Sequence, residues 1–179
     1  MRKVVLYELL SLDGVAESPD LWMPMVDDEV YLAHLGEVIA QQDAVLLGRA
    51  MYDDWAGIWP GFDMQPFADF INGVPKYVAT RTPLQKAWSG AERIAEPLET
   101  FVKKLKAEPG GDIGVHGSIS LAQSLLRSGL VDELRLVVAP TLAGKGRKLF
   151  DSQEVLRRLT LQDGRSTPSG LVLLSYSVA

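Results

Sequence analysis

The segments AVLLGR at residues 44–49 and IGVHGS at residues 113–118 each run an apolar strand into a glycine where a helix is expected to begin. Such a junction presents free backbone N–H groups and the positive end of a helix dipole, which together can bind phosphate. One junction is a weak signal, because a glycine that follows a strand most often forms a simple turn. Two junctions in a chain of 179 residues favour a dinucleotide held across the edge of a sheet.

Strands and helices alternate around these two segments. The strands expected in this part of the chain cover residues 4–10, 44–48, 74–80, 91–95 and 112–116. Apolar residues at helical spacing predict a helix over about 27–42, before the first glycine junction. A second helix follows Pro97, a residue suited to a first helical turn, and Pro-Gly-Gly at 109–111 ends it.

The last third of the chain changes from alternating elements to β-rich sequence. A third helix, expected from near Ser118 or Ser120 to Gly129, precedes it, and Ser120 with Gln123 fits a capping box. The strands expected after this helix cover residues 133–139, 159–165 and 171–178. Ser-Gly at 169–170 joins the last two strands as an antiparallel hairpin.

This order of elements predicts one three-layer α/β domain over residues 1–179. Its central sheet is expected to be mostly parallel, with helices on both faces and the hairpin added at the carboxyl terminus. Ligands of such sheets bind beyond the carboxyl ends of the strands. Both glycine junctions lie there, as do the turns at 11–14 and 80–82.

Composition excludes several classes of protein. The net charge of −5 argues against nonspecific nucleic-acid binding, which needs clustered cations. Without cysteine, thiol nucleophiles, thiolate metal sites and disulfides are absent, and no metal site is predicted. Glu8 and Asp13 interrupt the amino-terminal apolar run too early for a signal peptide, and no other stretch is long enough to span a membrane. We therefore expect a soluble, cytoplasmic protein.

Motifs spread over nearly the whole chain carry a family resemblance. They are SLDG at 11–14, LLGR at 46–49 with Met51, Tyr52 and Trp55, TRT at 80–82, VHGSI at 115–119 with Leu121, DEL at 132–134, and PTL at 140–142 with Gly144, Gly146, Leu149 and Phe150. In this order they resemble the dihydrofolate reductase fold. The closer resemblance is to the reductase domain of the bifunctional riboflavin-biosynthesis deaminase-reductase.

The resemblance implies NADPH as cofactor and hydride transfer to a C=N or C=O bond of a small pteridine-like, pyrimidine or ribosylamino substrate. The cofactor-binding residues that it implies are Leu12, Asp13, Gly14, Gly48, Arg49, Met51, Thr80, Arg81, Thr82, Gly117, Ser118 and Ile119. The first three would lie against the nicotinamide, and the last three would hold the pyrophosphate. Arg49, Arg81 and Thr82 would surround the ribose 2′-phosphate, because arginine offers a bidentate fork to a dianion.

Several of these residues also have a purely structural interpretation. Arg49 and Arg81 could be solvated surface charges, and Ser118 could be only an N-cap. His34 and His116 are interpreted as structural. The basic run at 144–148 lacks the spacing of a phosphate-binding loop and is expected to be flexible and solvated.

Two further sets of residues leave alternatives open. Trp55 and Trp59 could form a stacking platform for a planar substrate, or they could pack in the core or at a dimer interface. Asp28 is the candidate proton donor, because imine reduction needs a proton on nitrogen. Acids at 27–29 are also what a helix amino terminus favours, and water or the substrate could supply the proton instead.

A deaminase half, with its Pro-Cys-x-x-Cys motif, cannot exist in a chain without cysteine, so we predict a stand-alone NADPH-dependent reductase. One alternative is a noncatalytic nucleotide-binding sensor or scaffold with the same fold. Another is a purely structural dimer subunit. A homodimer is expected in any case, because the aromatic segment with Trp55, Trp59 and Phe62 and the β-rich carboxyl end offer apolar surface.

Overall fold

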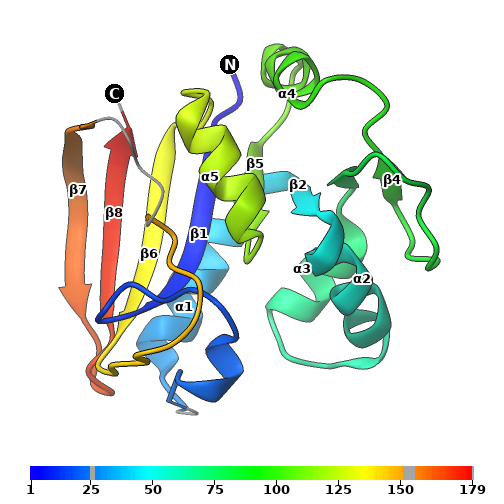
Figure 1. The fold of residues 1–179 in the computed structure, drawn as a ribbon. Helices are drawn as coiled ribbons and strands as arrows, with labels where there is room; N and C mark the ends of the chain where they lie inside the picture. The colour runs from blue at the N-terminus through cyan, green and yellow to red at the C-terminus, as the bar shows by residue number, and fades with distance from the viewer. Residues whose placement is uncertain (25–26, 151–155, 179) are drawn as a thin grey trace.

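A computed structural model describes residues 1–24, 27–150 and 156–178, and an eight-stranded sheet of order β4-β3-β2-β5-β1-β6-β8-β7 forms its centre (Figure 1). The strands are β1 (Val4–Ser11), β2 (Gln42–Gly48), β3 (Lys76–Ala79), β4 (Ala91–Arg93), β5 (Asp112–His116), β6 (Glu133–Ala139), β7 (Leu159–Ser166) and β8 (Val172–Val178). Strands β1 to β6 run parallel, whereas β8 runs antiparallel to β6 and to β7. The mostly parallel sheet with a carboxyl-terminal antiparallel hairpin is confirmed.

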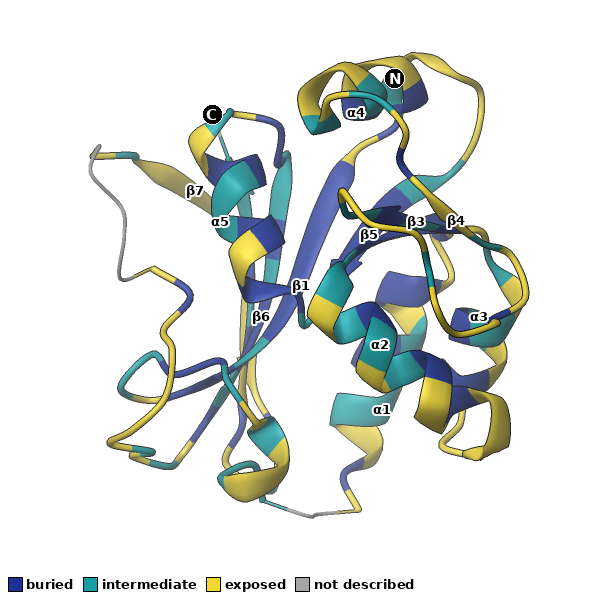
Figure 2. Cartoon of the chain, turned by 45° about the vertical axis from the view of Figure 1, so that its right-hand side comes forward, coloured by how far each residue is buried: buried dark blue, intermediate teal, exposed yellow. Residues whose placement is uncertain are grey.

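Helices cover both faces of this sheet, as predicted. They are α1 (Glu29–Ile39), α2 (Arg49–Ile58), α3 (Phe67–Gly73), α4 (Leu98–Ala107) and α5 (Ile119–Arg127), with short 3-10 turns η1 (Pro19–Leu21) and η2 (Trp59–Gly61). Side chains of β1 alternate between the faces: Leu6 packs in a core cluster with α4 and α5, and Tyr7 in a cluster with α1, α2 and α3. Buried residues follow β1 through the middle of the molecule (Figure 2).

Most predicted elements exist, and the differences lie at their ends. The predicted helix over 27–42 begins at Glu29, because the Asp28 carboxylate accepts a hydrogen bond from Tyr31 N (2.9 Å) as N-cap. The predicted capping box at Ser120 and Gln123 is wrong. The helix starts at Ile119 instead, and the Gln123 side chain donates to the carbonyl groups of residues 148 and 149.

Lys76 is a fully buried cation that ties β3 to the end of α3. Its Nζ donates to the carbonyl oxygens of Ile71 (2.8 Å), Val74 (2.7 Å) and Asn72 (3.3 Å), and lies 4.8 Å from the ring centroid of Trp88. The last carbonyl groups of a helix have no partners within it, so the lysine satisfies them. This contact holds the strand that leads into the 80–82 turn.

Among the described residues, no helix is both long and apolar enough to cross a bilayer. The same part of the chain holds no group of three or more histidine, aspartate or glutamate side chains placed to bind a metal ion.

Replacing the buried lysine, Lys76→Met, is expected to lower the free energy of unfolding by about 2 kcal/mol, because three carbonyl groups lose their donor. Urea unfolding followed by tryptophan fluorescence measures the change. The matched control Lys103→Met removes an exposed lysine of α4 and should change stability by less than about 0.5 kcal/mol. Equal effects of both substitutions would contradict the capping role.

Candidate functional site

The structure brings the predicted cofactor residues to one edge of the sheet. They follow the carboxyl ends of β3, β2, β5 and β1, which are neighbours in that order. Residues 80–82 follow β3, residues 48–51 follow β2, residues 117–119 follow β5, and residues 12–14 follow β1. Because parallel strands end at the same edge, four separate sequence motifs meet there.

A hydrogen bond joins the two glycine junctions directly. The backbone N–H of Gly48 donates to the Ser118 hydroxyl oxygen at 3.0 Å. Gly48 is the N-cap residue of α2, and Ser118 occupies the same position in α5 without a capping hydrogen bond from its own side chain. The Ser118 side chain therefore connects two helices instead of capping one. The amino termini of α2 and α5 lie side by side as a result.

Gly117 lies beside this junction in a backbone conformation that favours glycine. Its φ of +64° belongs to the left-handed region, and an added Cβ would come within 2.8 Å of Met51 Cε and 3.5 Å of the Trp55 ring. The backbone of Gly117 thus faces these two α2 side chains at close range. The backbone conformation favours glycine here, and an added Cβ would need the flexible end of the Met51 side chain to shift.

Arg49 and the 80–82 turn form a second contact between neighbouring strand ends. Arg49 Nη1 donates to Thr82 Oγ1 (2.6 Å) and to Pro83 O (3.0 Å), and Nε pairs with Asp53 (2.6 Å). The side chain of Arg81 is exposed, with no hydrogen bond or ion pair in the part of the chain that the structure describes. One arginine is thus positioned by its neighbours, and the other reaches into solvent beside it.

The turn after β1 is held by Asp13. Its carboxylate accepts hydrogen bonds from Ser11 Oγ (2.7 Å), Ala143 N (2.9 Å) and Gly144 N (2.9 Å), and these bonds lower the pKa of Asp13 to about 2. Asp13 therefore anchors the loop that follows β6. Leu12 beside it stays exposed at the sheet edge.

Arg147 is a residue near this edge that the sequence interpretation missed. It belongs to the basic run at 144–148, which is exposed as expected. Its Nη1 donates to Ser120 Oγ (3.2 Å) in the first turn of α5, and its Nε pairs with Glu17 (2.7 Å). A run of cations beside glycines was the available signal, but only the folded chain brings it next to a helix amino terminus.

The two tryptophans of the aromatic segment have different surroundings. Trp59 is 8% exposed and packs edge-on against Phe67, with ring centroids 4.8 Å apart. Trp59 therefore belongs to the core. Trp55 is half-buried, 5.7 Å from Trp59 in ring centroids, and lies next to Gly117 at the sheet edge.

Asp28 has the environment of a helix cap. Hydrogen bonds from the Ser169 and Thr167 side chains, with the backbone N–H of Tyr31, hold its pKa well below the usual value. A proton donor must be protonated when hydride arrives, and these bonds favour the ionised carboxylate. The assignment of Asp28 as proton donor therefore has no physical support in this geometry.

Glu8 is the second residue that the sequence interpretation missed. It is 3% exposed in the middle of β1, and its Oε2 atom has no hydrogen-bond partner among the described residues. Burial raises its pKa from 4.5 to about 8, so the carboxyl group is protonated at neutral pH. The alternation of Leu6, Glu8 and Leu10 was the available signal, because it places an acid on an inward face.

The two histidines lie in the α1 to α3 layer. His116 is buried, its Nε2 is 2.8 Å from Gln42 Oε1, and burial lowers its pKa to about 3. His34 is 2% exposed, and its Nδ1 lies 3.3 Å from an Arg165 guanidinium nitrogen. Its Nε2 has no partner in the described part of the chain.

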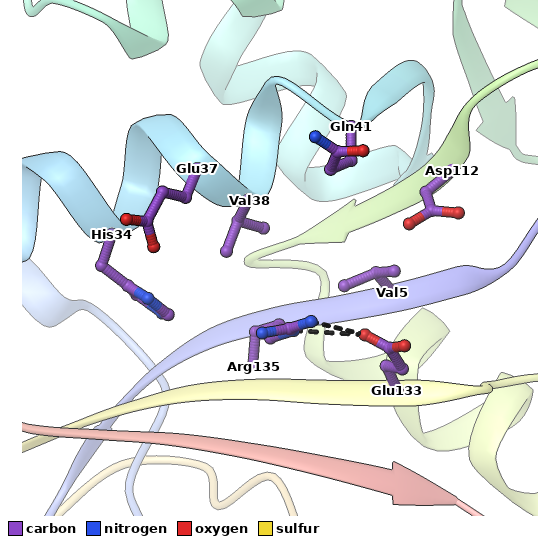
Figure 3. Close-up of a pocket in the computed structure, with 8 residues that line it drawn as sticks. All are labelled: Val5, His34, Glu37, Val38, Gln41, Asp112, Glu133 and Arg135. Atoms are coloured by element: carbon purple, nitrogen blue, oxygen red, sulfur yellow. Dashed lines mark hydrogen bonds and ion pairs between the residues drawn. The ribbon is translucent and has the colours of Figure 1, made fainter. Parts of the chain in front are cut away.

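A cavity of about 180 Å³ lies beside His34, at the amino-terminal edge of the sheet. Figure 3 shows the His34 ring directed from α1 toward Arg135 on β6, and Arg135 is paired with Glu133 (2.8 Å). Asp112, the first residue of β5, also lines it. This cavity is therefore separate from the predicted cofactor residues, which occupy the opposite edge.

The raised pKa of the buried Glu8 carboxyl group predicts that the free energy of unfolding depends on pH. Because the folded-state pKa of Glu8 lies above 4.5, the folded protein holds more protons than the unfolded chain between about pH 4.5 and 8. Stability therefore falls as pH rises through this window and levels off above it. Glu8→Gln should unfold at a higher temperature than the wild type at pH 8–9, with the difference shrinking toward pH 5.

Differential scanning fluorimetry across this range measures the effect. The control Glu92→Gln changes an exposed glutamate of β4 and should leave the curve parallel to that of the wild type. A constant offset between Glu8→Gln and wild type at every pH would show that Glu8 titrates normally.

Comparison with known proteins agrees with this architecture. The YyaP protein of Bacillus subtilis (strain 168), whose function is uncharacterised, is 29% identical over 182 residues, covering 98% of this chain and 94% of its own. A Shewanella sp. PV-4 protein provisionally attributed to riboflavin biosynthesis superposes with a TM-score of 0.75 at 18% identity, covering 99% of both chains. A pyrimidine reductase-like protein of Corynebacterium diphtheriae gives a TM-score of 0.72 at 18% identity, covering 99% of this chain and 92% of its own. The model of the RibD C-terminal domain matches residues 2–173, and the chain belongs to that family.

Proposed function

We propose that this protein is an NADPH-dependent reductase that transfers hydride to a C=N or C=O bond of a small pteridine-like, pyrimidine or ribosylamino substrate. The observation that carries the proposal is the Gly48–Ser118 hydrogen bond, which sets two helix amino termini side by side at the carboxyl edge of the sheet. Membership of the RibD C-terminal domain family supports a reductase with a nicotinamide cofactor.

The residues at this edge fit a dinucleotide. Gly117 has no side chain and directly precedes the N-cap of α5, which suits close approach of a pyrophosphate to the backbone N–H groups there. The amino termini of α2 and α5 supply positive potential there, and Arg147 adds a cation beside α5. In this proposal Gly48, Gly117, Ser118 and the first turn of each helix hold the phosphates.

The 80–82 turn fits the ribose 2′-phosphate that distinguishes NADPH from NADH. Arg49 is held against Thr82, and Arg81 lies exposed one residue away. A dianionic phosphate gains charge-assisted hydrogen bonds from guanidinium groups, whereas a 2′-hydroxyl does not. NADPH is therefore the preferred cofactor.

Half-buried apolar side chains near the same edge suit a flat substrate. The partly buried side chains that pack against the core cluster of α1, α2 and α3 include Leu9, Trp22, Met23, Tyr31, Met51 and Trp55. NADPH supplies the hydride, and these side chains orient a planar ring and exclude water from it. Since Asp28 is held as a carboxylate, the proton comes from water or from the substrate itself.

The descriptions of two structural neighbours support the proposed substrate class. One structural neighbour is described as pyrimidine reductase-like, and another is attributed to riboflavin biosynthesis. A pyrimidine or ribosylamino compound is therefore the first class to assay.

The ionised state of Asp28 favours one second candidate, a nucleotide-binding sensor or scaffold without turnover. A carbonyl, imine and pterin panel separates the two. Oxidation of bound NADPH by any of these compounds supports the reductase, and oxidation by none supports the sensor.

Ligand protection is the direct test of the cofactor. NADPH at a hundred times its dissociation constant should stabilise the folded protein by about 2.7 kcal/mol, which raises the melting temperature by about 5–10 °C for a chain of this size. Thermal unfolding with and without millimolar NADPH measures this, with NADH as the comparison. An unchanged melting temperature in NADPH would refute the proposed cofactor.

The 2′-phosphate contact has a separate test. Arg81→Ala should weaken NADPH binding roughly tenfold to a hundredfold, because a charge-assisted hydrogen bond is lost, and should change NADH binding by less than about threefold. Quenching of tryptophan fluorescence gives both dissociation constants. Arg93→Ala, an exposed arginine on β4, is the control and should affect neither. Equal losses for both cofactors would remove Arg81 from the 2′-phosphate site.

A further inference from the structure

The side chain of Glu8 lies on the face of the sheet that α5 covers, because Leu6 and Leu10 on the same face of β1 pack in the core cluster that contains α5 residues. The chain runs from β5 through α5 to β6, and β1 lies between those two strands, so α5 crosses over β1. Figure 1 shows α5 in front of β1. Glu8 pairs with Leu136 of β6, and Leu136 packs in the same core cluster as Ile119, the first residue of α5. The Glu8 side chain therefore points toward α5.

The sheet is notched at the level of Glu8. Pairing between β1 and β5 ends at Tyr7 and His116, whereas pairing between β1 and β6 continues to Ser11 and Ala139. The residue after His116 is Gly117, so Glu8 is the first β1 residue beside the end of β5. The notch lies between the residues proposed to hold pyrophosphate and the turn after β1.

The Leu9 backbone forms a hydrogen bond with the Glu8 carboxyl group, but no partner of Oε2 among the described residues explains why an acid occupies this position. Leu6 and Leu10, its neighbours on the same face, are buried leucines, and burial is the main cause of the raised pKa of Glu8. A buried polar atom without a partner costs stability, so such groups in native proteins call for a functional explanation. The Oε2 atom of Glu8 is thus a buried hydrogen-bonding atom that no group among the described residues satisfies.

We propose that Glu8 binds the carboxamide of the nicotinamide ring, and thereby sets the orientation of the ring in the notch. A neutral carboxylic acid presents one O–H donor and one carbonyl acceptor side by side, and a primary amide presents the complementary acceptor and donor. The two groups can therefore form a pair of parallel hydrogen bonds. This inference rests on the proposed cofactor and assigns a specific residue to its nicotinamide end.

Two substitutions separate hydrogen bonding from packing. Glu8→Gln keeps one donor and one acceptor in the same shape, whereas Glu8→Leu keeps the volume and removes both. Glu8→Leu should fold at least as stably as the wild type, because it removes an unsatisfied buried oxygen. The readout is the dissociation constant of NADPH from tryptophan fluorescence, alongside that of adenosine 2′,5′-bisphosphate, which lacks the nicotinamide.

Glu8→Leu should weaken NADPH binding about tenfold or more and leave adenosine 2′,5′-bisphosphate unchanged. Glu8→Gln should stay within about threefold of the wild type for both. The NADPH analogue with an acetyl group in place of the carboxamide lacks the N–H donors. It should bind to the wild type more weakly than NADPH does, and it should bind to Glu8→Leu as tightly as NADPH does.

Wild-type affinity of Glu8→Leu for NADPH would overturn the assignment while leaving the proposed cofactor standing. Equal weakening of NADPH and the bisphosphate would also overturn it, because the effect would not belong to the nicotinamide end. Failure of the wild type to bind either compound would overturn the cofactor proposal itself, and this inference with it.

Discussion

The alignment of β2 with β5 is the constraint on which the candidate site depends. Because the two strands run parallel and adjacent, both glycine junctions open at the same edge, and Gly48 N–H reaches the Ser118 hydroxyl. That single hydrogen bond sets the separation of two helix amino termini. Cations and backbone donors then converge on one region, which is the arrangement that a polyanionic cofactor needs.

The acids Asp13, Asp28 and Glu8 serve different purposes in this structure. At the carboxyl edge, Asp13 and Asp28 are ionised and saturated with hydrogen bonds, so they anchor loops and helix ends. Glu8 is buried in the middle of β1, just past the last residue that pairs with β5, and its Oε2 atom has no partner among the described residues. Asp13 and Asp28 therefore stabilise the fold, whereas the buried Glu8 carboxyl group costs stability. A ligand contact is expected at an acid of the second kind.

Much of the fold was predictable from local pattern. The strands β5 and β6 were predicted with their observed bounds, because glycine and helix-ending signals border them clearly. The end of the first helix at Ile39 was not predicted, because the apolar and polar residues at 40–42 continue a spacing that suits a helix. The capping box failed for a similar reason: Gln123 finds better partners in a loop distant in sequence.

By itself the sequence determined the order of elements, the parallel sheet with its final hairpin and the motifs that flank the strand ends, because these depend on short-range periodicity and turn chemistry. Only the tertiary structure decided how individual side chains are used. It made Asp28 the N-cap of α1, placed Trp59 in the core, brought Arg147 to α5 and left Glu8 Oε2 without a partner among the described residues. Burial and pairing between distant segments set these outcomes, and of these local spacing indicated only the inward-facing position of Glu8.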